Sequence, residues 1–198
     1  NDIFKVMDKN KILFDFLEKY KSLPEQRSTE WIEQRKLIIG GSEMSVITGD
    51  NPWKKIHNLI ENHVGLAEFN GNINTYWGTI LEDLVVKILQ TEWGCKIYET
   101  GSLPGVIPNQ RYSPDGLVYL SFLDKILLLE IKCAARRIAG GVVPKTYRPQ
   151  IYTGLDVVRI ADMGLFVDAM FRRCSIEDFG FNNRYDKQIH PDKKTKEP

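Results

Sequence analysis

The stretch SPDGLVYLSFLDKILLLEIKC, residues 113–133, constrains the fold more than any other part of the chain. Two apolar runs within it are separated by a turn-like segment at 121–125. Runs of this length on either side of a short turn predict a β-hairpin. A chain that contains such a hairpin must build a sheet with a buried face, because the apolar strands have to be covered.

The second strand of this hairpin ends in a charged pair. A strand alternates its faces, so Glu130 and Lys132 point to one side while Ile131 points to the other, into the core. Asp115 lies in a Ser-Pro-Asp-Gly turn just ahead of the first strand. Pairing of the two strands would bring Asp115 beside Glu130, so that two carboxylates and an ammonium share one small space.

Two carboxylates held close together repel each other unless a divalent cation lies between them. Oxygen ligands without a neighbouring thiolate or imidazole favour Mg²⁺ or Mn²⁺ over Zn²⁺. Lys132 would then orient the attacking water, help to deprotonate it, or offset charge on a phosphoryl transition state. The alternative is a plain hairpin with a surface ion pair, which contributes about 0 to 1 kcal/mol.

Length and hydropathy limit the chain to one domain. With 198 residues, 42% of them hydrophobic, it can bury one α/β core but not comfortably two. No apolar run approaches the roughly 18 residues that cross a bilayer, and the first residues lack a signal-peptide core. We expect a soluble, intracellular protein, in the host cytoplasm or nucleus if it is viral. Its three cysteines lie far apart, which predicts core residues rather than disulfides or a zinc site.

Positive charge is concentrated just beyond the hairpin, although the net charge is only +1. Residues 131–155 contain no acid and five basic residues: Lys132, Arg136, Arg137, Lys145 and Arg148. Phosphate contacts supply most of the affinity of proteins for nucleic acids, so this stretch suits a polyanionic substrate. A solvated basic loop is the alternative.

Hydrophobic periodicity and turn residues predict the elements around the hairpin. The predicted helices cover 8–22, 29–39, 42–47, 54–63, 74–90 and 147–159, and a further strand covers 164–167. Helices, then strands, then a helix and a strand predict an α/β fold with a mixed sheet flanked by helices. Residues 191–198 form a polar tail.

The helix predicted at 74–90 carries acidic residues beside its apolar stripe. Glu82 borders this stripe, whereas Asp83 faces the opposite, solvent side. A carboxylate at the position of Glu82 can reach a neighbouring sheet. The alternative is that it extends to water.

A second polar constellation precedes the hairpin in the chain. Gly40 and Gly41 are predicted to end the helix at 29–39 and to allow a tight turn, and Ser42 is predicted to open a short helix as its N-cap. The free N–H groups of such a helix start can bind an anion, and Arg35 could close over it with a bidentate contact to a terminal phosphate. The alternative is that Ser42 only caps the helix and Arg35 is a surface charge.

The order of these features resembles one enzyme family. Its motifs are similar to Glu82, Asp115 in SPDG, Glu130-Ile131-Lys132, and Gln150 in YRPQIYTGLDV. The family is that of the PD-(D/E)XK nucleases, specifically the lambda-exonuclease-like (YqaJ-type) viral recombination exonucleases. The stretch WIEQRKLIIGGSEMSVITGDNPWKK resembles the first motif of this family, and the resemblance spans roughly Trp31 to Val158.

The resemblance implies a restriction-endonuclease-like core around one metal site. The implied ligands of Mg²⁺, or of Mn²⁺ in its place, are Asp115, Glu130, the Ile131 carbonyl and Glu82, the last directly or through water. Lys132 would act on the nucleophile.

The resemblance also implies roles for residues outside the metal site. Gln150 would support Lys132 or the nucleophilic water. Arg35 and Ser42 match the phosphate pocket of the family, which has a further arginine where this chain offers only Lys54 and Lys55.

The implied activity is that of a Mg²⁺-dependent deoxyribonuclease, and within it a 5′-to-3′ exonuclease on double-stranded DNA with a 5′-phosphate end, in viral or phage recombination or repair. A single-strand annealing protein is an implied partner, and the family contains monomers and ring-shaped homotrimers. The alternatives are a structure-selective endonuclease, an RNA-cleaving nuclease of the same fold, and a non-catalytic nucleic-acid-binding module.

We expect one nuclease domain at 1–190, with an N-terminal helix at 1–25, phosphate-pocket helices at 26–65 and a catalytic core at 74–171.

Overall fold

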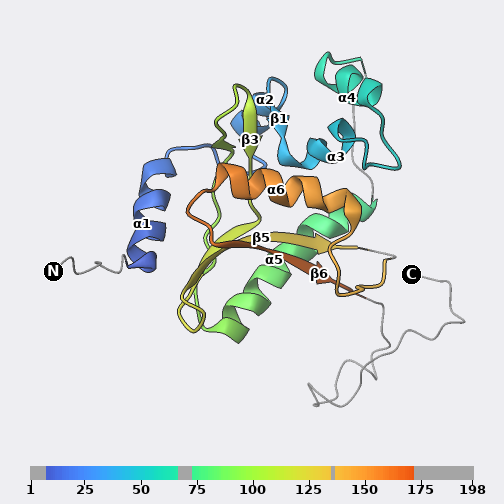
Figure 1. The fold of residues 1–198 in the computed structure, drawn as a ribbon. Coiled ribbons are helices and arrows are strands. Elements are labelled where there is room, and N and C mark those ends of the chain that lie inside the picture. The colour runs from blue at the N-terminus through green and yellow to red at the C-terminus, as the bar shows by residue number, and fades with distance from the viewer. Residues whose placement is uncertain (1–7, 67–72, 135–136, 172–198) are drawn as a thin grey trace, which may run out of the picture.

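The central element of the fold is a three-stranded sheet in the order β4, β5, β6 (Figure 1). The computed structural model describes residues 8–66, 73–134 and 137–171. β4 (Gly116–Leu120) and β5 (Lys125–Cys133) pair antiparallel, and β6 (Met163–Ala169) pairs parallel with β5. The predicted hairpin is therefore confirmed, and the strand predicted at 164–167 is one edge of its sheet.

A second, smaller sheet has the order β1, β3, β2. β1 (Ile39–Gly40) is parallel to β3 (Gln110–Tyr112), and β2 (Leu103–Pro104) is antiparallel to it. The predicted class, an α/β fold with mixed pairing and flanking helices, is confirmed. The strands form two mixed sheets where the sequence indicated one, because these short segments pair with one another rather than with the hairpin.

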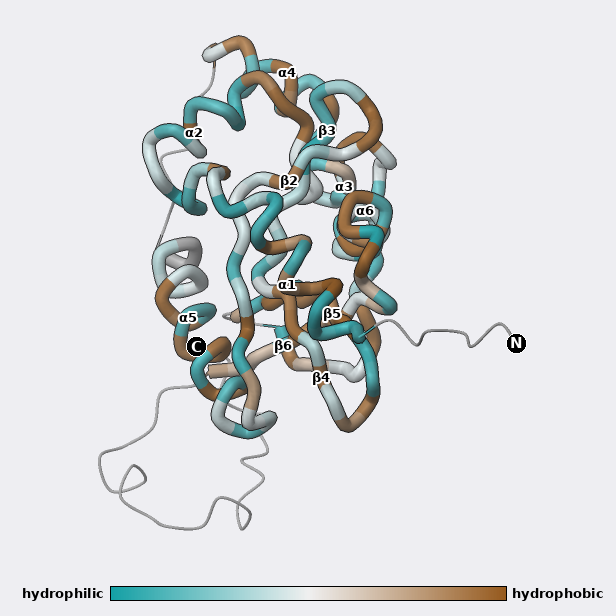
Figure 2. Tube along the Cα trace, turned by 90° about the vertical axis from the view of Figure 1, so that its left-hand side faces the viewer, coloured by the Kyte–Doolittle hydropathy of each residue, from teal (hydrophilic) through white to brown (hydrophobic). Residues whose placement is uncertain are grey.

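Helices cover both faces of the central sheet, which is why β5 is apolar on both sides. α5 (Ile73–Trp93) covers one face, and α1 (Lys9–Tyr20) and α6 (Arg148–Val157) cover the other. Figure 2 shows α5 and α6 on opposite sides of the strands. Buried residues on the α5 side are Val85, Ile97, Val118, Leu120, Leu127, Leu129 and Ile131. Those on the other side are Leu13, Leu103, Tyr112, Leu117, Ile126, Leu128 and Val158.

α5 extends beyond the predicted 74–90 at its C-terminal end, to Trp93. Gly94 follows it with φ of +60°, a left-handed conformation that glycine adopts without steric cost. The Cys95 N–H then donates to the Gln90 carbonyl over 3.3 Å, which satisfies the last turn.

α2 (Thr29–Arg35) is shorter than the predicted 29–39. Its N-cap is Ser28, and the Ser28 side chain accepts from the Trp31 N–H. The helix ends early because Ile39 pairs with β3, where its N–H donates to the Asn109 carbonyl over 2.8 Å. The prediction that Gly40 and Gly41 end this helix is wrong.

The predicted N-cap role of Ser42 is also wrong. Gly41–Glu43 form a 3₁₀ turn, η1, which leads directly into α3 (Met44–Ile47). Gly40 occupies the cap position, and its N–H donates to the Glu43 carboxylate over 2.9 Å. Ser42 lies inside the 3₁₀ turn with its side chain exposed.

The two remaining helices begin close to their predicted positions. α4 (Ile56–His63) starts after a turn at Asn51. The Oδ1 atom of Asn51 accepts hydrogen bonds from the Trp53 and Lys54 N–H groups. α6 follows the 3₁₀ turn η2 (Lys145–Tyr147). In the described part of the chain, every helix is too short or too polar to cross a membrane.

Candidate active site

The hairpin brings Asp115 against the end of β5. Its N–H donates to the Leu129 carbonyl over 3.2 Å, and its Oδ2 accepts from the Ile131 N–H over 2.6 Å. Lys132 Nζ lies 3.7 Å from the same oxygen. The predicted convergence of Asp115, Glu130 and Lys132 is therefore present.

Glu130 is fully buried, with each carboxylate oxygen bound to a different side chain. Its Oε1 accepts from Lys132 Nζ, and its Oε2 accepts from the Tyr112 hydroxyl over 2.7 Å. Lys132 Nζ also donates to the Ile131 carbonyl over 3.0 Å. Burial raises the pKa of Glu130 because a charged carboxylate loses its hydration there.

Lys132 supplies the positive charge of this cluster. Burial alone would lower the pKa of Lys132, but the neighbouring Glu130 and Asp115 carboxylates outweigh burial and raise it. The ammonium thus compensates two carboxylates at once.

Glu82 lies on α5, which packs against the hairpin, and its carboxylate is affected by the charges of Asp115, Glu130 and Lys132. Burial, followed by the nearby Asp115 charge, raises the pKa of Glu82 to about 7. Arg27 Nη2 donates to Glu82 Oε1 over 3.0 Å, and Arg27 Nη1 lies 3.6 Å from Asp83 Oδ1. Glu82 does not simply extend to water, whereas Asp83 is exposed as predicted.

The donor set suits a hard divalent cation. The charge of Asp115 raises the pKa of both Glu82 and Glu130, and all three side chains offer oxygen ligands. Among the described residues, no group of three His, Cys, Asp or Glu side chains is arranged so that it could hold a metal ion. The Lys132 ammonium takes part of the charge compensation that a cation would provide. The predicted ligand roles stay predictions.

Arg35 and Ser42 are brought together as the sequence indicated. Arg35 Nη2 donates to Ser42 Oγ over 3.1 Å, and the guanidinium carbon lies 4.7 Å from the Trp31 ring centroid. Trp31 Nε1 in turn donates to Ser113 Oγ over 3.2 Å, which connects Trp31 to the turn that carries Asp115. Among the described residues, no carboxylate lies within ion-pair distance of Arg35.

Gln150 lies on α6 beside the turn that carries Ser42. Its Cγ is 3.6 Å from the position that a Cβ on Gly41 would occupy. The hydrogen bonds of the described residues do not include one between Gln150 and Lys132, so its supporting role stays a prediction. Lys54 and Lys55 lie exposed in the turn before α4.

The predicted basic stretch is partly neutralised by acids from elsewhere in the fold. Arg137 pairs with Asp168 of β6 through two hydrogen bonds, one of them 3.2 Å, and lies 5.2 Å from the Tyr147 ring centroid. Lys145 Nζ lies 2.8 Å from Asp50 Oδ1. Arg136 lies outside the described residues. The predicted phosphate contacts of both arginines stay predictions.

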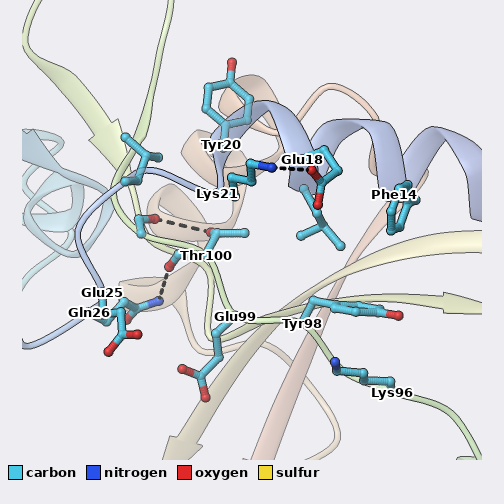
Figure 3. Close-up of a pocket in the computed structure, with 13 residues that line it drawn as sticks. Phe14, Glu18, Tyr20, Lys21, Glu25, Gln26, Lys96, Tyr98, Glu99 and Thr100 are labelled. Atoms are coloured by element: carbon cyan, nitrogen blue, oxygen red, sulfur yellow. Dashed lines mark hydrogen bonds and ion pairs between the residues drawn. The ribbon is translucent and has the colours of Figure 1, made fainter.

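A groove of about 520 Å³ lies apart from these carboxylates, between α1 and residues 96–101 (Figure 3). Its lining is a mixture of aromatic, acidic and basic side chains, with Lys21 paired to Glu18. The hairpin, rather than this groove, is the candidate active site, because Glu130 of β5 is the one fully buried carboxylate among the described residues.

Three contacts in the site were not predicted. They are the Tyr112 to Glu130 hydrogen bond, the Arg27 to Glu82 ion pair, and the Trp31 to Ser113 hydrogen bond. Each joins residues at least 18 positions apart in the chain. Local periodicity carries no signal for such pairs, although the Trp31 motif itself was recognisable.

Comparison with known proteins identifies the family. The YqaJ-like viral recombinase domain matches residues 30–161. The chain belongs to this family. Protein D345L of African swine fever virus (isolate Tick/Malawi/Lil 20-1/1983) is 32% identical over 205 residues, covering 89% of this chain and 59% of D345L. The uncharacterized protein YqaJ of Bacillus subtilis is 33% identical over 75 residues, which cover 37% of this chain and 24% of YqaJ. The chain thus spans less than two thirds of these relatives.

The fold is similar to that of a solved alkaline exonuclease. The crystal structure of the alkaline exonuclease from Laribacter hongkongensis matches with a TM-score of 0.60 and 22% identity, over 72% of this chain and 74% of that chain. The same enzyme in complex with dAMP matches with a TM-score of 0.59 and 22% identity, over 71% and 73% of the two chains. The predicted resemblance and fold are therefore confirmed.

Proposed function

We propose that this protein is a metal-dependent nuclease that hydrolyses DNA phosphodiester bonds. The observation that carries the proposal is the convergence of Asp115, the buried Glu130 and Lys132 on one hairpin. A protein that only binds nucleic acid has no need for two carboxylates at a site meant for polyanions. Membership of the viral recombinase family and the alkaline exonuclease fold support the same activity.

In this mechanism, Asp115, Glu130 and the Ile131 carbonyl would hold Mg²⁺ or Mn²⁺, with Glu82 as a further ligand. When bound, the divalent cation supplies Lewis acidity toward a phosphoryl oxygen. Lys132 donates toward the water or toward the phosphoryl oxygens that gain charge in the transition state. Its ammonium is held at this position by Glu130 and by the Ile131 carbonyl.

The preferred substrate that we propose is double-stranded DNA with a 5′-phosphate end, digested in the 5′-to-3′ direction. Arg35 and Ser42 form a polar pair beside the Asp115 turn, and Arg35 is held by stacking on Trp31. A terminal phosphate carries more charge than an internal one, so a guanidinium here favours the end of a strand. The single-domain organisation, an annealing partner and the oligomeric state stay predictions.

The experiment that tests this proposal uses a panel of substrates. Linear duplexes with 5′-phosphate or 5′-hydroxyl ends, covalently closed circles, nicked circles and RNA are incubated with Mg²⁺ and with EDTA. We expect digestion of linear duplexes only with metal, fastest from 5′-phosphate ends. Equal cutting of closed circles would replace the exonuclease with an endonuclease, and cleavage in excess EDTA would contradict metal dependence.

A further inference from the structure

Tyr112 occupies a buried position between three parts of the site. It is the last residue of β3 and is 1% exposed. A Cβ on Gly41 would lie 2.4 Å from its Cδ2, and a Cβ on Gly154 would lie 2.6 Å from its Cζ and 2.9 Å from its Oη. Distances this short leave no space for a methyl group on either side. Both glycines are therefore required for the ring to occupy its place.

The hydroxyl group of Tyr112 contacts Glu130, a candidate metal ligand. Tyr112 Oη donates to Glu130 Oε2 over 2.7 Å, while Lys132 binds Oε1. The two donors lie on different oxygens, so together they define the plane of the carboxylate. A ligand carboxylate that is oriented by a hydrogen bond binds metal more tightly than one that is free to rotate.

We propose that Tyr112 is a positioning residue that fixes the orientation of Glu130 for the divalent cation. This inference rests on the proposed metal-dependent nuclease. The ring is held by Gly41 of η1 and by Gly154 of α6, so the orientation of Glu130 is set by elements outside the hairpin. A purely structural tyrosine would need its ring in this place but not its hydroxyl.

The Tyr112→Phe variant separates these two roles, because it keeps the ring and removes the donor. Tyr119→Phe is the matched control, since its hydroxyl also donates to a carboxylate, Asp124, over 3.2 Å on the exposed end of the hairpin. The measurement is Mn²⁺ binding by calorimetry, together with the rise in melting temperature on Mn²⁺ titration. The calorimetry is carried out below the melting temperature of each variant.

We expect the Mn²⁺ dissociation constant of Tyr112→Phe to rise about tenfold or more, the usual effect of losing an orienting partner of a ligand. That of Tyr119→Phe should not change. Excess Mn²⁺ should restore the single-turnover rate of Tyr112→Phe, because only occupancy is impaired. An unchanged Mn²⁺ constant would assign Tyr112 to packing alone.

A second variant tests the same inference if Tyr112→Phe does not fold. Gly154→Ala pushes on the hydroxyl end of the ring, while alanine favours the helix by about 1 kcal/mol. Gly78→Ala in α5 is its control, because a Cβ there meets no atom within 4 Å. Weaker Mn²⁺ binding in Gly154→Ala but not in Gly78→Ala supports the inference, and equal binding overturns it. If the wild type itself binds no Mn²⁺, the proposed function fails instead.

Discussion

Arg27 is paired with Glu82 across 3.0 Å, which places a cation beside a carboxylate that we propose as a metal ligand. Arg27 lies in the loop between α1 and α2, and the adjacent Gln26 donates to the Pro114 carbonyl over 2.8 Å. This loop is thus attached both to the turn that carries Asp115 and to α5.

The Arg27→Gln variant should bind divalent metal more tightly. Loss of one positive charge beside the ligands removes repulsion of the cation, which at a partly exposed site is worth about 1 kcal/mol, or roughly fivefold in affinity. The measurement is the Mg²⁺ concentration for half-maximal cleavage. Arg159→Gln, which removes an exposed pair with Asp156, is the control. A higher Mg²⁺ requirement would mean that Arg27 mainly positions Glu82.

Replacement of Lys132 should affect turnover far more than DNA binding. Lys132→Met keeps most of the side-chain volume and removes the charge that acts in the transition state, so we expect a loss of about 100-fold or more in the single-turnover rate. The control is Lys125→Met at the exposed start of the same strand. If DNA affinity falls in proportion and the rate at saturation does not, Lys132 belongs to the DNA-binding surface instead.

Arg35→Ala should abolish discrimination between 5′-phosphate and 5′-hydroxyl ends. The guanidinium is held over Trp31 and bound to Ser42, ready for a charged group. The ratio of initial digestion rates on the two ends measures this directly. Lys36→Ala, at a neighbouring exposed residue paired with Glu33, is the control. A ratio that survives in Arg35→Ala would assign end recognition to another residue.

Asp162→Asn should destabilise the fold by about 1 kcal/mol at neutral pH, because it weakens a charge-assisted hydrogen bond at a partly exposed site. The Lys9 ammonium and the Ile126 N–H lower the pKa of Asp162. A lowered pKa contributes stability above the unfolded-state value of about 3.9, and this stability is lost as the pH falls through the folded-state value.

Urea denaturation of both proteins between pH 7 and pH 3 measures this difference. The wild-type advantage should shrink as the pH falls below about 4. A constant difference across this range would mean that the charge of Asp162 contributes nothing.

The hairpin and its charged end were predictable because alternation and the turn are local properties. Asp115 follows from the same pattern, since the register of β4 and β5 pairs Gly116 with Leu129. The early end of α2 was not predictable from the sequence. Ile39 and Gly40 form a strand instead of helix because they pair with β3, which lies about 70 residues further along the chain.

The partners of the site carboxylates were hidden for a similar reason. Tyr112 looks like an ordinary strand aromatic, and only the tertiary fold brings its hydroxyl to Glu130. Arg137 looked like a free cation, since its partner Asp168 comes from a strand beyond the acid-free stretch. Charge counted along the sequence therefore overstated the positive surface.

The most direct test of the account is single-turnover cleavage of a linear 5′-phosphorylated duplex by Asp115→Asn, compared with Asp124→Asn. Asp124 is an exposed hairpin residue with φ of +50°, a conformation that asparagine also tolerates. Circular dichroism confirms folding of both variants. We predict no metal-dependent cleavage by Asp115→Asn and a wild-type rate for Asp124→Asn. Wild-type cleavage by folded Asp115→Asn would contradict an active site at the hairpin.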